Sequence, residues 1–241
     1  MSETTDSYRT GPQGIPARRL VIAVVALVVG TATIALAWPR LIAGVSDDPM
    51  EETLHSLTTP NPAPELVIQH MLAVKEQVTK VHATAKILAD IALLSLRESL
   101  RVGPLTDEGK AALEASIAAH EKSLRYDPRN AYVWTRLGQA LFVRDGASAE
   151  NLGQVLETAV TFAPYDSRLV VARVDMSLAA WEQLSGATRS LMENQIHIAA
   201  NQSPTALASL SRDRFALSRV TEILGDDPIL LKRFIYAYAH S

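Results

Sequence analysis

The chain has 241 residues, a formal net charge of −3 and no cysteine, so disulfides and thiolate metal sites are excluded. This length allows one large domain or two small ones, and the charge provides no basic surface for nucleic acid. Ala and Leu are abundant while aromatic residues make up 5% of the chain, which favours helix over sheet.

The N-terminal part contains one long uncharged run, from Leu20 to Trp38. A helix rises about 1.5 Å per residue, so this run comes close to the roughly 30 Å hydrocarbon thickness of a bilayer. Arginines precede the run and acidic residues follow it. The positive-inside bias therefore predicts a cytoplasmic tail at 1–19 and a transmembrane anchor at 20–38. The alternative is a cleaved signal peptide, because Ala35-Leu36-Ala37 is similar to a cleavage site.

The next two segments are a linker and a long helix. Residues 39–64 carry five prolines and four acidic residues, which predicts an extended linker. From 65 to 101 the apolar residues alternate spacings of four and three, which predicts one long helix with a coiled-coil-like seam. The seam consists of Val67, Met71, Val74, Val78, Val81, Ala85 and Leu88. It either pairs with a second copy, giving a homodimer through 65–101, or packs on the chain's own helices. Apolar residues beside the seam favour internal packing.

The remainder of the chain predicts only helices and short turns. Gly103 ends the long helix, Thr106 caps the next one, and Ser203 with Pro204 starts a later one. The expected helices run from Asp107 to the Asp127-Pro128 turn, over 132–144, over 149–162, from the Pro164 turn to Trp181, over 184–202, from 204 to about 211, over 212–224 with Gly225 as cap, and over 228–239. No strand-like alternation occurs, so the predicted fold class is all-α, with one domain over 65–241.

Residues 127–166 form the clearest repeat unit, two helices between two Pro turns. The residues that define it are Trp134, Leu137, Gly138, Ala159 and Pro164. This pattern resembles the tetratricopeptide repeat, and the resemblance implies a superhelix of helical hairpins after the anchor. Two positions depart from the repeat: Leu141 stands where Tyr is usual, and Val174 stands where the following unit would have Gly.

The whole chain is also similar to a loosely defined group of single-span, repeat-containing envelope proteins of Gram-negative bacteria, found alongside exopolysaccharide or O-antigen assembly machinery. The matching features are Trp38-Pro39-Arg40-Leu41, Ala163-Pro164-Tyr165-Asp166, Trp181, Gln195-Ile196, and Asp226-Asp227-Pro228-Ile229-Leu230-Leu231 with Phe234. The resemblance implies a single-pass inner-membrane protein with a periplasmic C-terminal domain and protein partners in the envelope. It implies no catalytic residues.

No residue pattern indicates catalysis or a bound cofactor. The six histidines form no pair with metal-ligand spacing, and neither a phosphate-binding glycine motif nor a Gly-x-Ser-x-Gly elbow occurs. Acidic pairs at 107–108 and 226–227 begin helices, where the helix dipole accounts for them. The sequence therefore predicts no metal, no cofactor and no enzyme.

The first helix of such a repeat lines a groove, and its outward side chains are the candidate binding residues. They are Tyr132, Thr135, Arg136, Gln139 and Val143. Tyr132 with Arg136 one turn later suits an extended peptide or a sugar face, unless Tyr132 packs on a neighbouring hairpin and Arg136 is solvated. Trp134 is assigned to the core.

These observations predict a non-enzymatic scaffold or adaptor in an envelope complex, with polysaccharide assembly as the first expectation. The alternatives are a periplasmic chaperone for unfolded clients and an enzyme with an unrecognised site.

Overall fold

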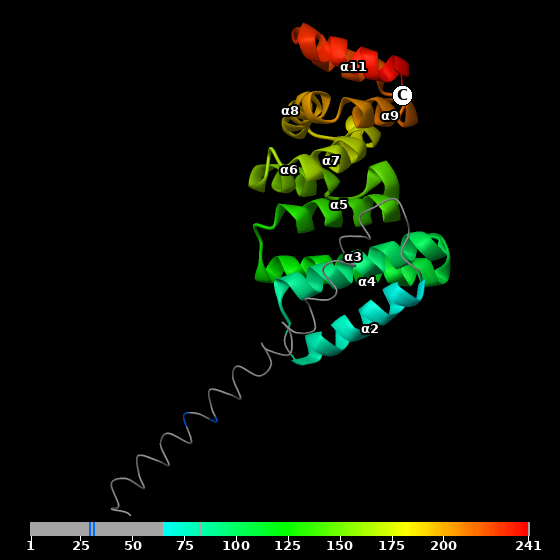
Figure 1. The fold of residues 1–241 in the computed structure, drawn as a ribbon, viewed down its shortest axis with the longest axis vertical. Helices are drawn as coiled ribbons and strands as arrows, with labels where there is room; N and C mark the ends of the chain where they lie inside the picture. The colour runs from blue at the N-terminus through cyan, green and yellow to red at the C-terminus, as the bar shows by residue number, and fades with distance from the viewer. Residues whose placement is uncertain (1–28, 30, 32–64, 82, 241) are drawn as a thin grey trace, which may run out of the picture. The chain divides into compact units, whose positions relative to one another are not determined.

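A computed structural model describes residues 29, 31, 65–81 and 83–240 (Figure 1). The predicted tail, transmembrane anchor and linker thus lie outside the described residues, except for Val29 and Thr31, which are helical and exposed. None of the helices formed by described residues combines the length and the apolar character needed to cross a bilayer.

Every regular element in the described part of the chain is helical, which confirms the all-α prediction. The α-helices are α2 (Glu65–Val81), α3 (Ala85–Val102), α4 (Asp107–Tyr126), α5 (Ala131–Asp145), α6 (Leu152–Phe162), α7 (Ser167–Ala179), α8 (Gly186–Gln202), α9 (Pro204–Asp213), α10 (Leu217–Ile223) and α11 (Pro228–His240). Short 3₁₀ turns cover Gly146–Ser148, Trp181–Gln183 and Leu224–Asp226.

The helices of residues 65–240 pack in successive pairs. α3 packs on α4, α5 on α6, α7 on α8, and α9 on α11, while α3, α5, α7 and α9 also contact one another in sequence. Figure 1 shows these layers following chain order from α2 to α11. Each helix therefore packs mainly against helices close to it in the sequence.

Two clusters of buried apolar side chains hold the pairs together. One lies among α3, α4, α5 and α6 and includes Leu113 and Val133. The other extends from α6 to α11 and includes Leu156, Met192 and Phe234. Leu141 packs against both clusters.

The glycine in α5 lies where three helices approach one another. A Cβ atom on Gly138 would lie 3.3 Å from Val155 Cγ1 of α6 and 3.4 Å from Met176 Cε of α7. The small residue therefore lets both helices pack closely on α5.

The prediction of one continuous helix over 65–101 is wrong. The chain breaks after α2, and Thr84, in an extended conformation, caps α3 by accepting a hydrogen bond from Ile87 N at 3.2 Å. α2 then packs back on α3, where Lys75 Nζ lies 2.7 Å from Asp90 Oδ2. The predicted seam is thus divided between two helices, and Met71 and Leu88 are buried within the chain. The predicted homodimer is not tested by this packing.

Other helix boundaries also differ from prediction. Helix α6 starts at Leu152 instead of 149 because Asn151 takes a left-handed conformation with φ of 64°. The helix expected over 212–224 is interrupted at Phe215, which has φ of 51°. Trp181 lies in a 3₁₀ turn beyond α7, and Gly225 lies within another 3₁₀ turn, so it is not a left-handed helix cap.

Candidate functional site

The start of α5 is fixed by a hydrogen-bonded turn. Asn130 caps the helix by accepting from Val133 N at 3.2 Å, and its Nδ2 donates to Asp127 Oδ2 at 3.1 Å. The indole nitrogen of Trp134 donates to Pro128 O at 2.9 Å. These bonds hold the first turn of α5, and with it Tyr132, in a defined orientation.

Tyr132, Arg136 and Gln139 come together on one side of α5. The Arg136 guanidinium carbon lies 5.1 Å from the centre of the Tyr132 ring, within the range of a cation–π interaction. Arg136 Nη1 also donates to Gln139 Oε1 at 2.8 Å. All three side chains are half-buried. The structure therefore places Arg136 in contact with two other predicted groove residues, Tyr132 and Gln139.

Thr135 does not face outward, so its assignment to the groove is wrong. It is 1% exposed, donates to Ala131 O at 2.9 Å and accepts from Arg173 Nε at 3.0 Å. The physical reason is that α7 packs on α5 and covers this position. Val143 is half-buried and packs against the cluster among α3 to α6.

Arg173 of α7, which sequence reasoning did not single out, is fully buried behind this face. It donates to Ala159 O and Ala163 O, both at 2.8 Å, and so closes the C-terminal end of α6. Burial lowers the pKa of Arg173 to about 10. Gln195 donates to Pro164 O at 2.7 Å, so the Pro164 turn is also held from α8. The positive charge of Arg173 lies at the negative end of the α6 dipole, and this interaction stabilises the charged guanidinium.

Arg97 of α3 is a second cation beside the Tyr132–Arg136 pair, and the sequence pattern did not predict it. It is half-buried. Burial lowers its pKa, and the neighbouring Arg136 lowers it further, while Tyr132 acts in the opposite direction. Among the described residues, neither Arg97 nor Arg136 has a carboxylate partner. Two half-buried guanidinium groups without counter-charge favour an anionic ligand.

His120 of α4 lies in the interior next to this cationic pair. Its Nδ1 is 2.9 Å from Ser116 O. Burial lowers the pKa of His120 to about 4, and the charge on Arg136 contributes in the same direction. The imidazole is therefore neutral at pH 7, and the fixed charges of the face are those of the arginines.

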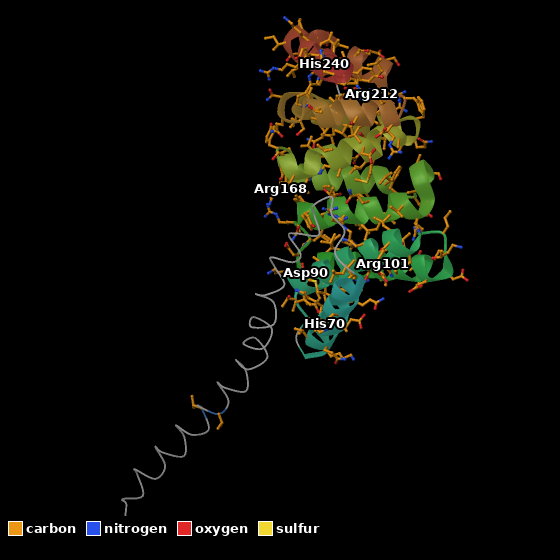
Figure 2. All side chains as sticks on the ribbon, turned by 45° about the vertical axis from the view of Figure 1, so that its right-hand side comes forward. His70, Asp90, Arg101, Arg168, Arg212 and His240 are labelled. Carbon is orange, nitrogen blue, oxygen red and sulfur yellow. The ribbon has the colours of Figure 1, made fainter. Side chains whose placement is uncertain are left out.

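Arg168 of α7 extends away from the stack at its edge (Figure 2). It forms a two-point contact with Asp166, with Nη2 to Oδ2 at 2.8 Å and Nε to Oδ1 at 3.0 Å. These hydrogen bonds from Arg168 are the main cause of the lowered pKa of Asp166. Arg168 therefore already has a counter-charge, which distinguishes it from Arg97 and Arg136.

Trp134 is only half-buried, so its assignment to the core is wrong in part. It lines a cavity of about 410 Å³ between α4, α5 and α6, together with Ile117, Leu124 and Leu137. The polar residues of the cavity wall are Glu121, Arg144, Glu150, Asn151, Gln154 and Thr158. Trp134 still packs against the cluster among α3 to α6.

No protein-family profile, curated protein or solved structure matches this chain. Within the described residues, no group of three or more His, Asp or Glu side chains is arranged to hold a metal ion. We call the surface formed by Tyr132, Arg136 and Gln139 of α5 with Arg97 of α3 the α5 face. It can recognise a ligand through one aromatic ring, two guanidinium groups and one amide.

Proposed function

We propose that this protein is a non-enzymatic scaffold that binds an acidic, extended peptide segment of a partner on the face formed by Tyr132, Arg136 and Gln139 with Arg97. The single observation that carries the proposal is the half-buried pair Arg97 and Arg136, which has no carboxylate partner among the described residues. A peptide carboxylate would supply the missing charge through bidentate hydrogen bonds, and Tyr132 would offer its ring face to the peptide.

The pairwise packing of α3 to α11 supports the further proposal that the domain is a short tetratricopeptide-like superhelix. Tyr132 of α5 lies close enough to Arg97 of α3 and to Arg168 of α7 to raise the pKa of both guanidinium groups. An extended ligand lying along these residues would cross three layers.

We also propose that the domain is periplasmic and is held at the inner membrane by the uncharged segment 20–38. Charge asymmetry around that segment supports this orientation. The expected partners are proteins of an envelope complex, with polysaccharide assembly as the first pathway to examine.

The test is a pull-down of the full-length protein in mild detergent, with the variant Tyr132→Ala/Arg136→Ala measured beside it. The matched control is Lys110→Ala/Lys122→Ala, which removes two exposed side chains from α4. The proposal predicts a defined, stoichiometric partner that the parent and the control retain and the variant loses, while circular dichroism shows that all three proteins remain folded.

Assorted unfolded chains bound equally by all three proteins would contradict the scaffold and support a chaperone. A partner retained by the variant would show that the binding surface lies elsewhere on the molecule.

A further inference from the structure

The last helix, α11, has one face buried and one face open. Phe234 is fully buried, and Leu230, Leu231 and Tyr238 pack against the cluster that extends from α6. On the other face, Ile229 is 70% exposed and Tyr236 is 67% exposed. Figure 1 shows α11 at the end of the described stack, where no further described helix covers its outer face.

The exposed residues of α11 form a regular helical stripe. Ile229, Arg233, Tyr236 and His240 are separated by four, three and four positions, so they lie above one another on one side of the helix. This is the spacing by which one helix packs along another. The outer face of α11 therefore has the geometry of an unpartnered helix–helix contact.

A groove of about 870 Å³ runs beside this stripe. Its second wall is formed by Asn201 at the end of α8 and by Pro204 and Thr205 at the start of α9. Arg233 Nη1 donates to Asn201 Oδ1 at 3.0 Å and so ties the two walls together.

The aromatic end of the groove is also held in place. The rings of Tyr236 and His240 are stacked with centres 4.3 Å apart, and His240 Nδ1 lies 2.8 Å from Tyr236 O. Figure 2 shows His240 on this last helix of the stack. The two rings therefore present one stacked aromatic surface to a partner.

The groove carries positive charge without acidic residues. Lys232 and Arg233 line it, and no Asp or Glu is among the described residues of its wall. A partner that brings carboxylates is therefore complementary. A second copy of the chain docked through the same face would add the same two cations and no carboxylate from the described groove wall, which is unfavourable.

We propose that this groove docks an amphipathic helix of a partner protein that carries an apolar stripe flanked by Asp or Glu. The apolar stripe would cover Ile229 and Tyr236, and the flanking carboxylates would pair with Lys232 and Arg233. Helices that bind in grooves are recognised in this way through anchors at spacings of three and four. The inference does not depend on the proposed ligand of the α5 face, which lies on other helices.

The experiment measures binding of two fluorescent peptides to the full chain in lipid nanodiscs, where no detergent competes for the apolar surface. Both peptides are about 18 residues, or about five helical turns, with the same Leu stripe. One carries flanking Glu residues, and the other carries Lys at the same positions. The protein has a formal net charge of −3, so non-specific attraction favours the basic peptide. We expect the acidic peptide to bind at least about tenfold more tightly in fluorescence anisotropy.

Variants locate the binding. Lys232→Glu/Arg233→Glu is expected to weaken the acidic peptide at least about tenfold, and Tyr236→Ala to weaken both peptides. The matched control Lys110→Glu/Lys122→Glu makes the same change of charge on exposed positions of α4 and is expected to have no effect. Tyr132→Ala/Arg136→Ala is expected to bind normally, which separates this groove from the α5 face.

Four results would overturn the proposal. They are no binding of the acidic peptide at about 1 mM, equal binding of the two peptides, unchanged binding to Lys232→Glu/Arg233→Glu, and an equal loss in the α4 control. Sedimentation of the unliganded protein supplies a further check. A dimer that disappears on Tyr236→Ala would assign the groove to a second copy and contradict the partner helix.

Discussion

Arg173 shows how one buried side chain is stabilised without a carboxylate in contact with it. Its donors reach two carbonyl groups at the end of α6 and the hydroxyl of Thr135, at 2.8 to 3.0 Å. Asp166 is near enough to raise its pKa, although burial has the larger, opposite effect. The guanidinium thus satisfies acceptors that no other described side chain reaches.

Removal of Arg173 is therefore expected to destabilise the fold strongly. Arg173→Ala leaves a cavity and removes the guanidinium donor from Thr135 Oγ1, Ala159 O and Ala163 O, so the free energy of unfolding should fall by about 3 to 5 kcal/mol. Arg168→Ala is the matched control, because that exposed side chain contacts only the nearby Asp166 and its loss should cost less than about 1 kcal/mol. Urea unfolding followed by circular dichroism measures both. Equal stabilities of the two variants would contradict this account of Arg173.

His120 gives the stability of the domain a defined pH dependence. In the unfolded chain its pKa is near 6.5, whereas burial holds it at about 4 in the folded protein. Between these values the unfolded state binds a proton that the folded state does not. Stability is therefore complete above about pH 6.5 and falls as the pH decreases towards 4.

The expected loss between pH 7 and pH 5 from His120 alone is about 2 kcal/mol. His120→Asn, whose side-chain amide can donate to Ser116 O in place of Nδ1, should lose this part of the dependence. The measurement is the difference between urea midpoints at the two pH values, for parent and variant. If both proteins lose the same stability over this interval, His120 is not the group that titrates.

At the scale of helices, most starts and ends follow from short-range signals in the sequence. Thr106 accepts from Gly109 N at 3.0 Å and Gly103 has φ of 96°, both as predicted. Pro204 begins α9 as expected, but Ser203 makes no side-chain cap there. The break before Thr84 was not predicted because no Gly or Pro marks it, so the apolar periodicity continues across it. The break can be recognised only from the folded structure, in which α2 packs back on α3.

The candidate site was predictable within one helix and not between helices. Spacings of three and four residues place Tyr132, Arg136 and Gln139 on one side of α5 from sequence alone. Arg97 could not be inferred, because its proximity to Arg136 depends on the packing of α3 against α5. The burial of Thr135 depends in the same way on α7.

Phe215, in the turn between α9 and α10, has a backbone conformation that is unfavourable for a bulky residue. Its φ of 51° lies in the left-handed region that suits glycine, and its side chain is 94% exposed. Phe215→Gly should therefore raise the free energy of unfolding by about 1 kcal/mol. Asn151→Gly, at φ of 64°, should gain less, because Asn tolerates this conformation. Thermal unfolding compares the two, and no gain for Phe215→Gly would mean that the exposed ring stabilises the fold in another way.

At the scale of the whole described stack, contacts link mainly neighbouring helices, so a defect should have local effects. Phe234→Ala removes the fully buried side chain of α11 and should weaken its docking by about 3 to 5 kcal/mol. Amide hydrogen exchange should accelerate in α9 to α11 and stay unchanged in α4 and α5. Faster exchange throughout residues 83–240 would show instead that the stack opens as one unit.

The bonds of Arg173 set a limit to such local opening. The Arg173 guanidinium of α7 contacts the Thr135 hydroxyl of α5 and donates to Ala159 O near the end of α6. Gln195 of α8 donates to Pro164 O in the turn between α6 and α7. The α7–α8 pair therefore cannot separate from the α5–α6 pair without breaking these bonds. Local unfolding should therefore begin at α11 and end at α8. The groove beside α11 can then unfold and refold while the α5 face stays intact.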